Sequence, residues 1–123
     1  MAFVIKAEIG DPRAKTFTFA AQKTMYGGKN IAAGDTIFLF ASETEGGQGL
    51  IARGVVRQTP RVSIAVRLTA SAKRPLGRSS LKPFSNWRDG KPQTELNFKF
   101  YRQATNKIAG VSDVAAAFLD TFF

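Results

Sequence analysis

The sequence contains neither cysteine nor histidine among its 123 residues. The absence of cysteine excludes disulfide bonds and a thiol nucleophile. The absence of both residue types excludes the common Cys/His zinc sites, and a histidine general base is excluded as well. The sequence therefore predicts no metal site and no cofactor, and the groups that remain for chemistry are carboxylates, hydroxyls and cations.

Long apolar runs are also missing. No stretch is long enough to cross a bilayer, and residues 1–9 alternate and carry Lys6 and Glu8, unlike a cationic leader with an apolar core. We therefore expect no membrane partner and a cytoplasmic protein. A chain of this length can bury one core. Because it shows no internal repeat and no linker, we expect residues 1–123 to form a single domain.

Acidic residues are scarce in the second part of the chain. Residues 1–50 hold five Lys/Arg and five Asp/Glu, whereas residues 51–123 hold thirteen basic residues and four acidic ones. The whole formal excess of +9 therefore lies after residue 50. A field of one sign favours polyanions, so we expect nucleic acid, either DNA or RNA, as the partner. The alternative is that these cations only solubilise an exposed face.

Alternation of apolar and polar residues with period two dominates the chain and predicts strands. The expected strands are residues 3–9, 36–41, 50–57, 61–70 and 95–102, with a brief further one at 17–19. Residues 36–41 are apolar on both faces, which is typical of a central strand. Ile37 and Leu39 should fill a barrel, and Phe38 and Phe40 should lie under a covering helix.

The last third of the chain predicts one strand, one helix and a long loop. In residues 95–102 we expect Leu96, Phe98 and Phe100 to point inward and the residues between them outward. Ser112 can cap a helix. Its apolar side chains share one face and should cover the barrel: Val114, Ala115, Phe118, Leu119 and Phe122.

Two shorter helical turns complete the prediction, at residues 20–25 and 76–81, the second within a long basic segment at 71–92. The expected fold class is α+β. It is a small mixed, mainly antiparallel β-barrel of five or six strands, with a C-terminal helix and one or two short helices.

One stretch carries a family resemblance. It contains Gly28-Lys29-Asn30, then Gly34-Asp35, the strand 36–42, and a second strand 49–56 with Gly54 inside it. This pattern resembles the PUA-like superfamily, and within it the EVE and ASCH domains. The resemblance implies a small β-barrel whose cleft receives a nucleobase, as in the EVE and related YTH readers of modified bases.

The resemblance also nominates cleft residues. EVE domains usually have an Arg-Asn pair, then a short helix before the Gly-Asp turn, and an aromatic, a His and a Ser at the end of the next strand. Here Lys29 stands in the Arg position, only residues 31–33 intervene, and the His is replaced by Ala41. Asn30 and Ser42 carry over as candidate cleft residues, with Gly28 and Lys29 beside Asn30.

Physical reasoning nominates the aromatic walls, because a base taken out of its stack needs aromatic faces to replace its neighbours. Trp87 is the single tryptophan and lies in the irregular basic segment, although it could instead anchor that loop to the barrel. Tyr26 precedes two glycines that would let a ligand approach the backbone, or it could cap a helix. Tyr101 could stack on a base or cover the outer face.

Ten basic residues are candidates for phosphate contacts. They lie on two successive strands and on the adjoining loop: Arg53, Arg57, Arg61, Arg67, Lys73, Arg74, Arg78, Lys82, Arg88 and Lys91. Each of them could equally be a solvated surface residue.

The sequence thus favours a domain that binds nucleic acid without reacting with it, and that seats a single modified base in a barrel cleft. One alternative is a magnesium-dependent nuclease that uses Asp89, Glu95 and Lys99, although their spacing fits the usual Glu-x-Lys motif poorly. Another is a basic protein-interaction or ribosome-associated module, which predicts no small pocket.

Overall fold

Seven strands and several short helices are described by the computed structural model, which covers residues 2–11, 13–20, 22–58, 63–102 and 106–123. The strands are β1 (Ala2–Ala7), β2 (Thr16–Ala20), β3 (Thr24–Met25), β4 (Thr36–Ala41), β5 (Gly49–Gln58), β6 (Ser63–Ser71) and β7 (Lys107–Val111). The helices are α1 (Arg78–Leu81), α2 (Pro92–Leu96) and α3 (Asp113–Asp120). Single turns form η1 (Gly28–Asn30), η2 (Glu43–Glu45) and the π-helical η3 (Asn97–Tyr101).

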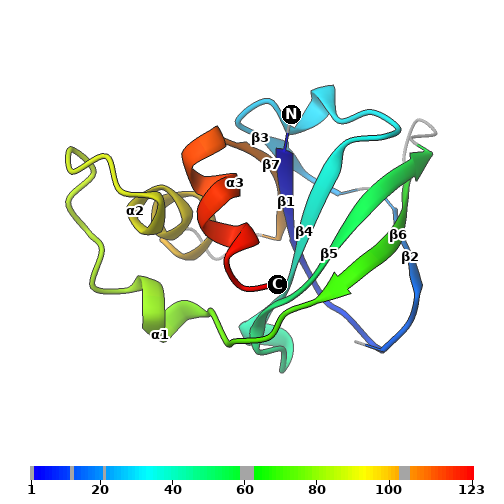
Figure 1. Cartoon of the computed structure of the whole chain (residues 1–123), viewed down its shortest axis with the longest axis horizontal. Helices are drawn as coiled ribbons and strands as arrows, with labels where there is room; N and C mark the ends of the chain where they lie inside the picture. The colour runs from blue at the N-terminus through cyan, green and yellow to red at the C-terminus, as the bar shows by residue number, and fades with distance from the viewer. Residues whose placement is uncertain (1, 12, 21, 59–62, 103–105) are drawn as a thin grey trace.

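The strands form one curled, mixed sheet in the order β2-β6-β5-β4-β1-β7-β3. β1 is parallel to β4 and antiparallel to β7. Figure 1 shows the sheet curling along one side of the molecule, with α1, α2 and α3 gathered on the other. The predicted α+β barrel with a C-terminal helix is confirmed, although the sheet has seven strands where five or six were expected. No helix in the described ranges is long and apolar enough to span a membrane.

Two apolar clusters lie on the two faces of the central strands. Ile37 and Leu39 of β4 belong to the cluster inside the curled sheet, together with Phe3 and Ile5 of β1. The alternate side chains of β4 point to a second cluster that includes Leu119 of α3. The prediction that residues 36–41 form a central strand buried on both faces is confirmed.

The helical side of β1 also buries a pair of lysines. Lys6 and Lys107 are register partners across β1 and β7, and both are buried. The Lys6 Nζ donates a 2.7 Å hydrogen bond to the Phe100 carbonyl oxygen. Burial, and then the charges of Lys6 and Lys23, hold the pKa of Lys107 below its ordinary value. This arrangement ties η3 to the middle of the sheet.

The strand predicted at 95–102 is wrong. Residues 92–101 form α2 followed by η3. Over this stretch an alternating pattern also fits a helix, because Leu96 and Phe100 are four residues apart and both are buried. Pro92 occupies the first turn of α2, a position where its missing N–H costs nothing. The place beside β1 that such a strand could have taken belongs to β7.

Three smaller expectations also need correction. Residues 20–25 do not make a helical turn, because Ala20 ends β2 and β3 begins at Thr24. β7 was not predicted at all. In α3, Val114 is exposed, whereas the rest of the expected apolar face packs inward. The cap itself is confirmed, since the Ser112 Oγ accepts a 3.1 Å hydrogen bond from the Ala115 amide. The helical turn expected at 76–81 is present as α1.

Gly54 sits where β5 and β6 approach each other at a register shift. A Cβ at this position would lie 2.7 Å from the Arg67 carbonyl oxygen and 2.7 Å from the Val66 Cγ1. We predict that Gly54→Ala lowers the free energy of unfolding by about 1–3 kcal/mol, because the strands would have to separate. Urea denaturation measures this change.

Gly10→Ala is the matched control, because a Cβ there would meet nothing within 4 Å. It should leave stability unchanged or raise it by up to about 1 kcal/mol. Equal stability of the two variants would contradict the close approach of β5 and β6 at Gly54.

Candidate nucleic-acid interface

A pocket of about 340 Å³ lies where α2 and η3 meet the residue that follows β3. Its lining combines aromatic, cationic and acidic side chains: Tyr26, Trp87, Gly90, Lys91, Thr94, Glu95, Phe98 and Lys99. The pocket brings together Tyr26 and Trp87, which are distant in sequence. Lys91 is the phosphate candidate that also lines it. We call this cavity the aromatic pocket.

Tyr26 is held in an unusual backbone conformation. Its φ of 50° lies in the left-handed region, and Gly27 follows with a φ of 79°. The Gly110 amide donates a 3.2 Å hydrogen bond to the Tyr26 carbonyl oxygen, which fixes this turn against β7. The ring is 47% exposed, and the Lys99 Nζ lies 5.0 Å from its centroid. Because the strand β3 ends at Met25, directly before Tyr26, the alternative that Tyr26 caps the end of a helix is wrong.

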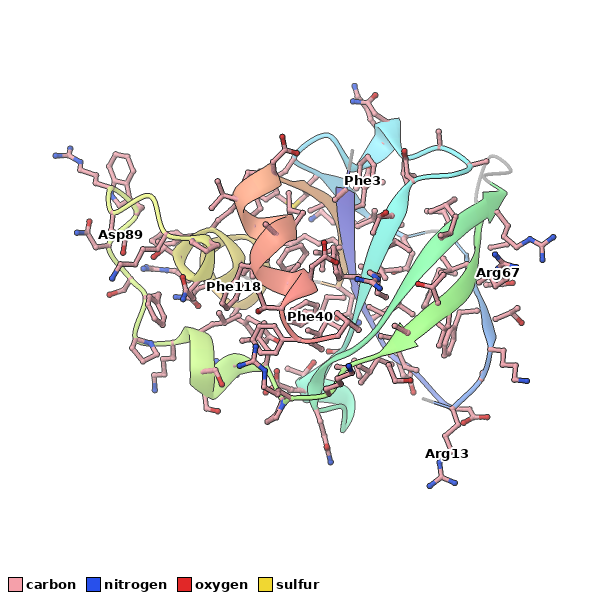
Figure 2. All side chains as sticks on the ribbon, viewed as in Figure 1. Phe3, Arg13, Phe40, Arg67, Asp89 and Phe118 are labelled. Atoms are coloured by element: carbon pink, nitrogen blue, oxygen red, sulfur yellow. The ribbon has the colours of Figure 1, made fainter. Side chains whose placement is uncertain are left out.

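Trp87 is carried by the loop between α1 and α2. Its side chain is 68% exposed, which contradicts the alternative that it anchors the loop in the core. The Arg88 guanidinium lies 4.8 Å from the ring centroid. Figure 2 shows the loop, marked by Asp89, projecting from the end of the molecule opposite Arg67.

Asp89 shapes the base of this loop. One carboxylate oxygen accepts from the Lys91 amide at 2.9 Å, and the other accepts from the Thr94 hydroxyl at 2.9 Å. The Lys91 amide bond is the main reason that the pKa of Asp89 lies below its ordinary value. These bonds connect the loop to the start of α2.

Glu95 and Lys99 supply paired charges beside the aromatic rings. The Lys99 Nζ donates to the Glu95 carboxylate at 3.0 Å and to the Gly110 carbonyl oxygen at 2.7 Å. Ser112 donates to Glu95 through both its amide and its hydroxyl. Partial burial raises the pKa of Glu95, but the hydrogen bonds from Ser112 and the charge of Lys99 outweigh burial and lower it. The aromatic pocket therefore holds an ionised acceptor next to a cationic donor.

The candidates that rest on the family resemblance do not line the aromatic pocket. Gly28 is buried against β7, where a Cβ would lie 2.2 Å from the Ile108 carbonyl oxygen. Its lack of a side chain therefore serves the packing of the chain on itself. Lys29 and Asn30 are exposed on η1. Ser42 is buried at the end of β4, and its hydroxyl pairs with that of Thr44 at 3.0 Å.

Tyr101 lies elsewhere on η3. Its ring packs edge-on against Phe40, with centroids 6.3 Å apart, and the Lys6 Nζ lies 4.9 Å from the ring. It lines a separate cleft together with Arg78 and Lys82. Tyr101 packs against the same apolar cluster as the buried Phe100, although the predicted strand would have placed the two side chains on opposite faces.

Some of the phosphate candidates already bond to other groups of the protein, and others are exposed to solvent. Arg53 pairs with Asp120 at 2.7 Å, and Arg74 donates to the Thr121 carbonyl oxygen at 2.9 Å and stacks on Phe122. The other described candidates are exposed: Arg57, Arg67, Lys73, Arg78, Lys82, Arg88 and Lys91. Arg61 lies outside the described residues.

The residues proposed for a nuclease are engaged with other groups. Glu95 pairs with Lys99, and Asp89 accepts from Thr94 and Lys91. Among the residues that the structure describes, no group of three or more His, Cys, Asp or Glu could hold a metal ion.

Sequence reasoning missed Phe98 and Thr94 as pocket residues and treated Glu95 and Lys99 only as nuclease candidates. Two signals could have found the helix that brings them together. Pro92 is a typical first residue of a helix, and Glu95 precedes Lys99 by four residues, the spacing of a helical ion pair.

The Glu95 contacts give the stability a defined pH dependence. Because folding lowers the pKa of Glu95, its contribution is present above its ordinary value of 4.5 and is lost as the pH falls through the lowered pKa. We predict that Glu95→Gln lowers the free energy of unfolding by about 1–2 kcal/mol near neutral pH. The difference in this free energy between the variant and the wild type should shrink as the solution is acidified. Urea unfolding at a series of pH values measures it. The control Glu8→Gln removes an exposed carboxylate and should lower the free energy of unfolding by less than about 0.5 kcal/mol. If the difference between Glu95→Gln and the wild type grew in acid, the lowered pKa assigned to Glu95 would be contradicted.

Comparisons with known proteins identify the fold. No protein-family model matches the sequence, and no curated protein matches it significantly. The DUF55 domain of human thymocyte nuclear protein 1 has a TM-score of 0.70 at 12% identity, covering 98% of this chain and 97% of that chain. A Pseudomonas syringae protein has a TM-score of 0.65 at 16% identity, covering 100% of both chains. Human THYN1 in complex with 5-methylcytosine-containing DNA has a TM-score of 0.67 at 13% identity, covering 98% of this chain and 95% of that chain. The chain therefore has the fold of these solved structures, a small α+β barrel of the class that its sequence pattern predicted.

Proposed function

We propose that this protein binds nucleic acid and seats one base, taken out of its strand, in the aromatic pocket. The observation that carries the proposal is the placement of Tyr26 and Trp87, both exposed, on one cavity of about 340 Å³. Exposing large rings to water is unfavourable, so their joint presence at a cavity indicates a ligand with a flat apolar face. A nucleobase has such a face, and stacking on an aromatic side chain is worth about 1–3 kcal/mol per base.

Glu95 and Lys99 would read the edge of that base. Ser112 and Lys99 together make three bonds to the Glu95 carboxylate, and a carboxylate has about four acceptor positions. One position therefore remains for an exocyclic amine, which cytosine, adenine and guanine carry and thymine and uracil lack. Lys99, fixed by Glu95 and Gly110, would donate to an adjacent ring nitrogen or carbonyl oxygen.

The charge of the surrounding surface suits the strand on either side of the base. Lys91 lines the aromatic pocket, and Arg88 is stacked on Trp87. Cations in these positions would contact flanking phosphates, which position the strand without reading its sequence. The net charge of +9 would draw the polyanion toward the protein and make its binding depend on salt.

The comparison with human THYN1 supports a modified base as the ligand. That protein shares this fold and has been crystallised with DNA that contains 5-methylcytosine. A methyl group adds apolar area that can pack on a ring, and Phe98 lines the aromatic pocket beside Trp87. A modified cytosine is therefore the first ligand to test. The pocket also counts against a basic interaction module, for which no small cavity was expected.

A double-variant cycle on protein and ligand tests this function. Labelled single strands of one sequence would carry 5-methylcytosine, cytosine or an abasic residue at the central position. We predict that Trp87→Ala weakens binding of the 5-methylcytosine strand by about 5- to 150-fold, because one stacking contact is lost. Fluorescence anisotropy at fixed salt measures the affinities.

The abasic strand is the control on the ligand side. Wild-type protein should bind it more weakly than the base-containing strands, and Trp87→Ala should weaken it no further. An equal loss for abasic and base-containing strands would mean that Trp87 contacts the backbone, and the base-seating function would be wrong.

A further inference from the structure

A second cleft lies between α1 and η3 and is separate from the aromatic pocket. It has a volume of about 210 Å³ and is lined by Arg78, Lys82, Ser85, Asn97, Tyr101 and Arg102. In the described part of the chain, the two cavities share no lining residue. They adjoin through Arg102, whose guanidinium lies 4.7 Å from the centroid of Phe98, a ring that lines the aromatic pocket.

The charges around this second cleft are of one sign. Arg78, Lys82 and Arg102 line it, and no acidic side chain of the described residues does. The Glu43 carboxylate accepts from the Arg78 amide at 3.0 Å and lines a smaller neighbouring cavity. Three cations on one concave surface repel each other and favour an anion between them.

Tyr101 forms part of the wall between this cleft and the smaller neighbouring cavity, because it lines both. Its hydroxyl oxygen is buried. Burial, followed by the nearby Glu43 carboxylate, raises the pKa of Tyr101 well above its ordinary value, so the hydroxyl keeps its proton. The Glu43 carboxylate is the acceptor beside this hydroxyl, and the donors left for a ligand in the cleft are those of Arg78, Lys82, Ser85 and Arg102.

Hydrogen bonds hold the segments that form the wall of the cleft in place. The Asn97 side-chain amide donates to the Phe84 carbonyl oxygen at 2.9 Å, which holds the segment with Lys82 and Ser85 against η3. The Arg102 amide donates to the Asn97 carbonyl oxygen at 2.9 Å and closes η3. The cationic groups thus come from two segments that are fixed to each other, residues 78–82 and the end of η3.

We propose that this cleft binds a phosphate group. Two guanidinium groups, one ammonium and one hydroxyl offer more donors than a carboxylate, with about four acceptor positions, can satisfy. A phosphate monoester carries more charge than a carboxylate and a third terminal oxygen. A phosphodiester carries one charge shared by two terminal oxygens, and the planar fork of arginine matches an oxygen pair of either group. The phosphate belongs either to a nucleic-acid strand or to a free phosphate ester. The cleft is a site of its own and does not depend on a base entering the aromatic pocket.

The test uses the full chain, labelled with ¹⁵N, and inorganic phosphate as the probe. We expect saturable shifts of the amide signals of residues 78–82 and 97–102. Arg102→Gln should weaken this binding by about tenfold or more, because a charge-assisted bond is removed. Arg13→Gln removes the same charge at the opposite end of the molecule (Figure 2) and should bind phosphate like wild type.

Absence of saturable shifts, or equal weakening by Arg102→Gln and Arg13→Gln, would overturn the phosphate site. Competition by an unlabelled single strand for the phosphate-shifted signals would identify the source as the nucleic-acid backbone, and its absence would identify a free phosphate ester. Trp87→Ala should leave phosphate binding unchanged. Failure of base binding and failure of phosphate binding are therefore separate results.

Discussion

The burial of β1 on both faces is the constraint on which the rest of the structure depends. β1 lies between β4 and β7. Phe3 and Ile5 point into the curled sheet, and Val4 points to the helical side, each without exposed surface. Because neither face meets water, the barrel interior and the helical layer have to form on its two sides together. Lys6 then connects that strand to η3 through the Phe100 carbonyl oxygen.

The attachment of η3 to β1 places both cavities. η3 contributes Phe98 and Lys99 to the aromatic pocket and Asn97 and Tyr101 to the second cleft. β7, the other neighbour of β1, contributes Gly110, whose amide holds the turn at Tyr26 and whose carbonyl oxygen receives the Lys99 Nζ. Most walls of the aromatic pocket are therefore positioned by the core, whereas Trp87, Gly90 and Lys91 reach it from the loop between α1 and α2. A rigid wall facing an exposed ring suits a ligand that enters between them.

The sequence patterns predicted the strands and the helix cap that depend on residues close together in the chain. The central strand at 36–41, the strand that became β5 and the Ser112 cap follow from alternation and capping and are present. Residues 95–102 were misassigned because Leu96, Phe98 and Phe100 fit two periods over so short a stretch. For the site, Tyr26 and Trp87 were nominated from residue type and loop position, and the fold brings them together. Asn30 and Ser42 rested on a motif alone, and long-range packing directs them elsewhere. The second cleft was not predicted, because its cations meet only once η3 is a helix.

The indole N–H of Trp87 offers the most direct test of the central claim, since the chain has one tryptophan and its signal needs no assignment. The measurement is a ¹H–¹⁵N spectrum recorded during titration with a single strand that carries one 5-methylcytosine. If a base enters the aromatic pocket, the indole signal will shift saturably together with the amides of Thr94 and Glu95, which line the same pocket. A strand bound through phosphates alone would shift the amides of residues 78–82 and 97–102 around the second cleft and leave the indole signal in place. That second result would contradict the account.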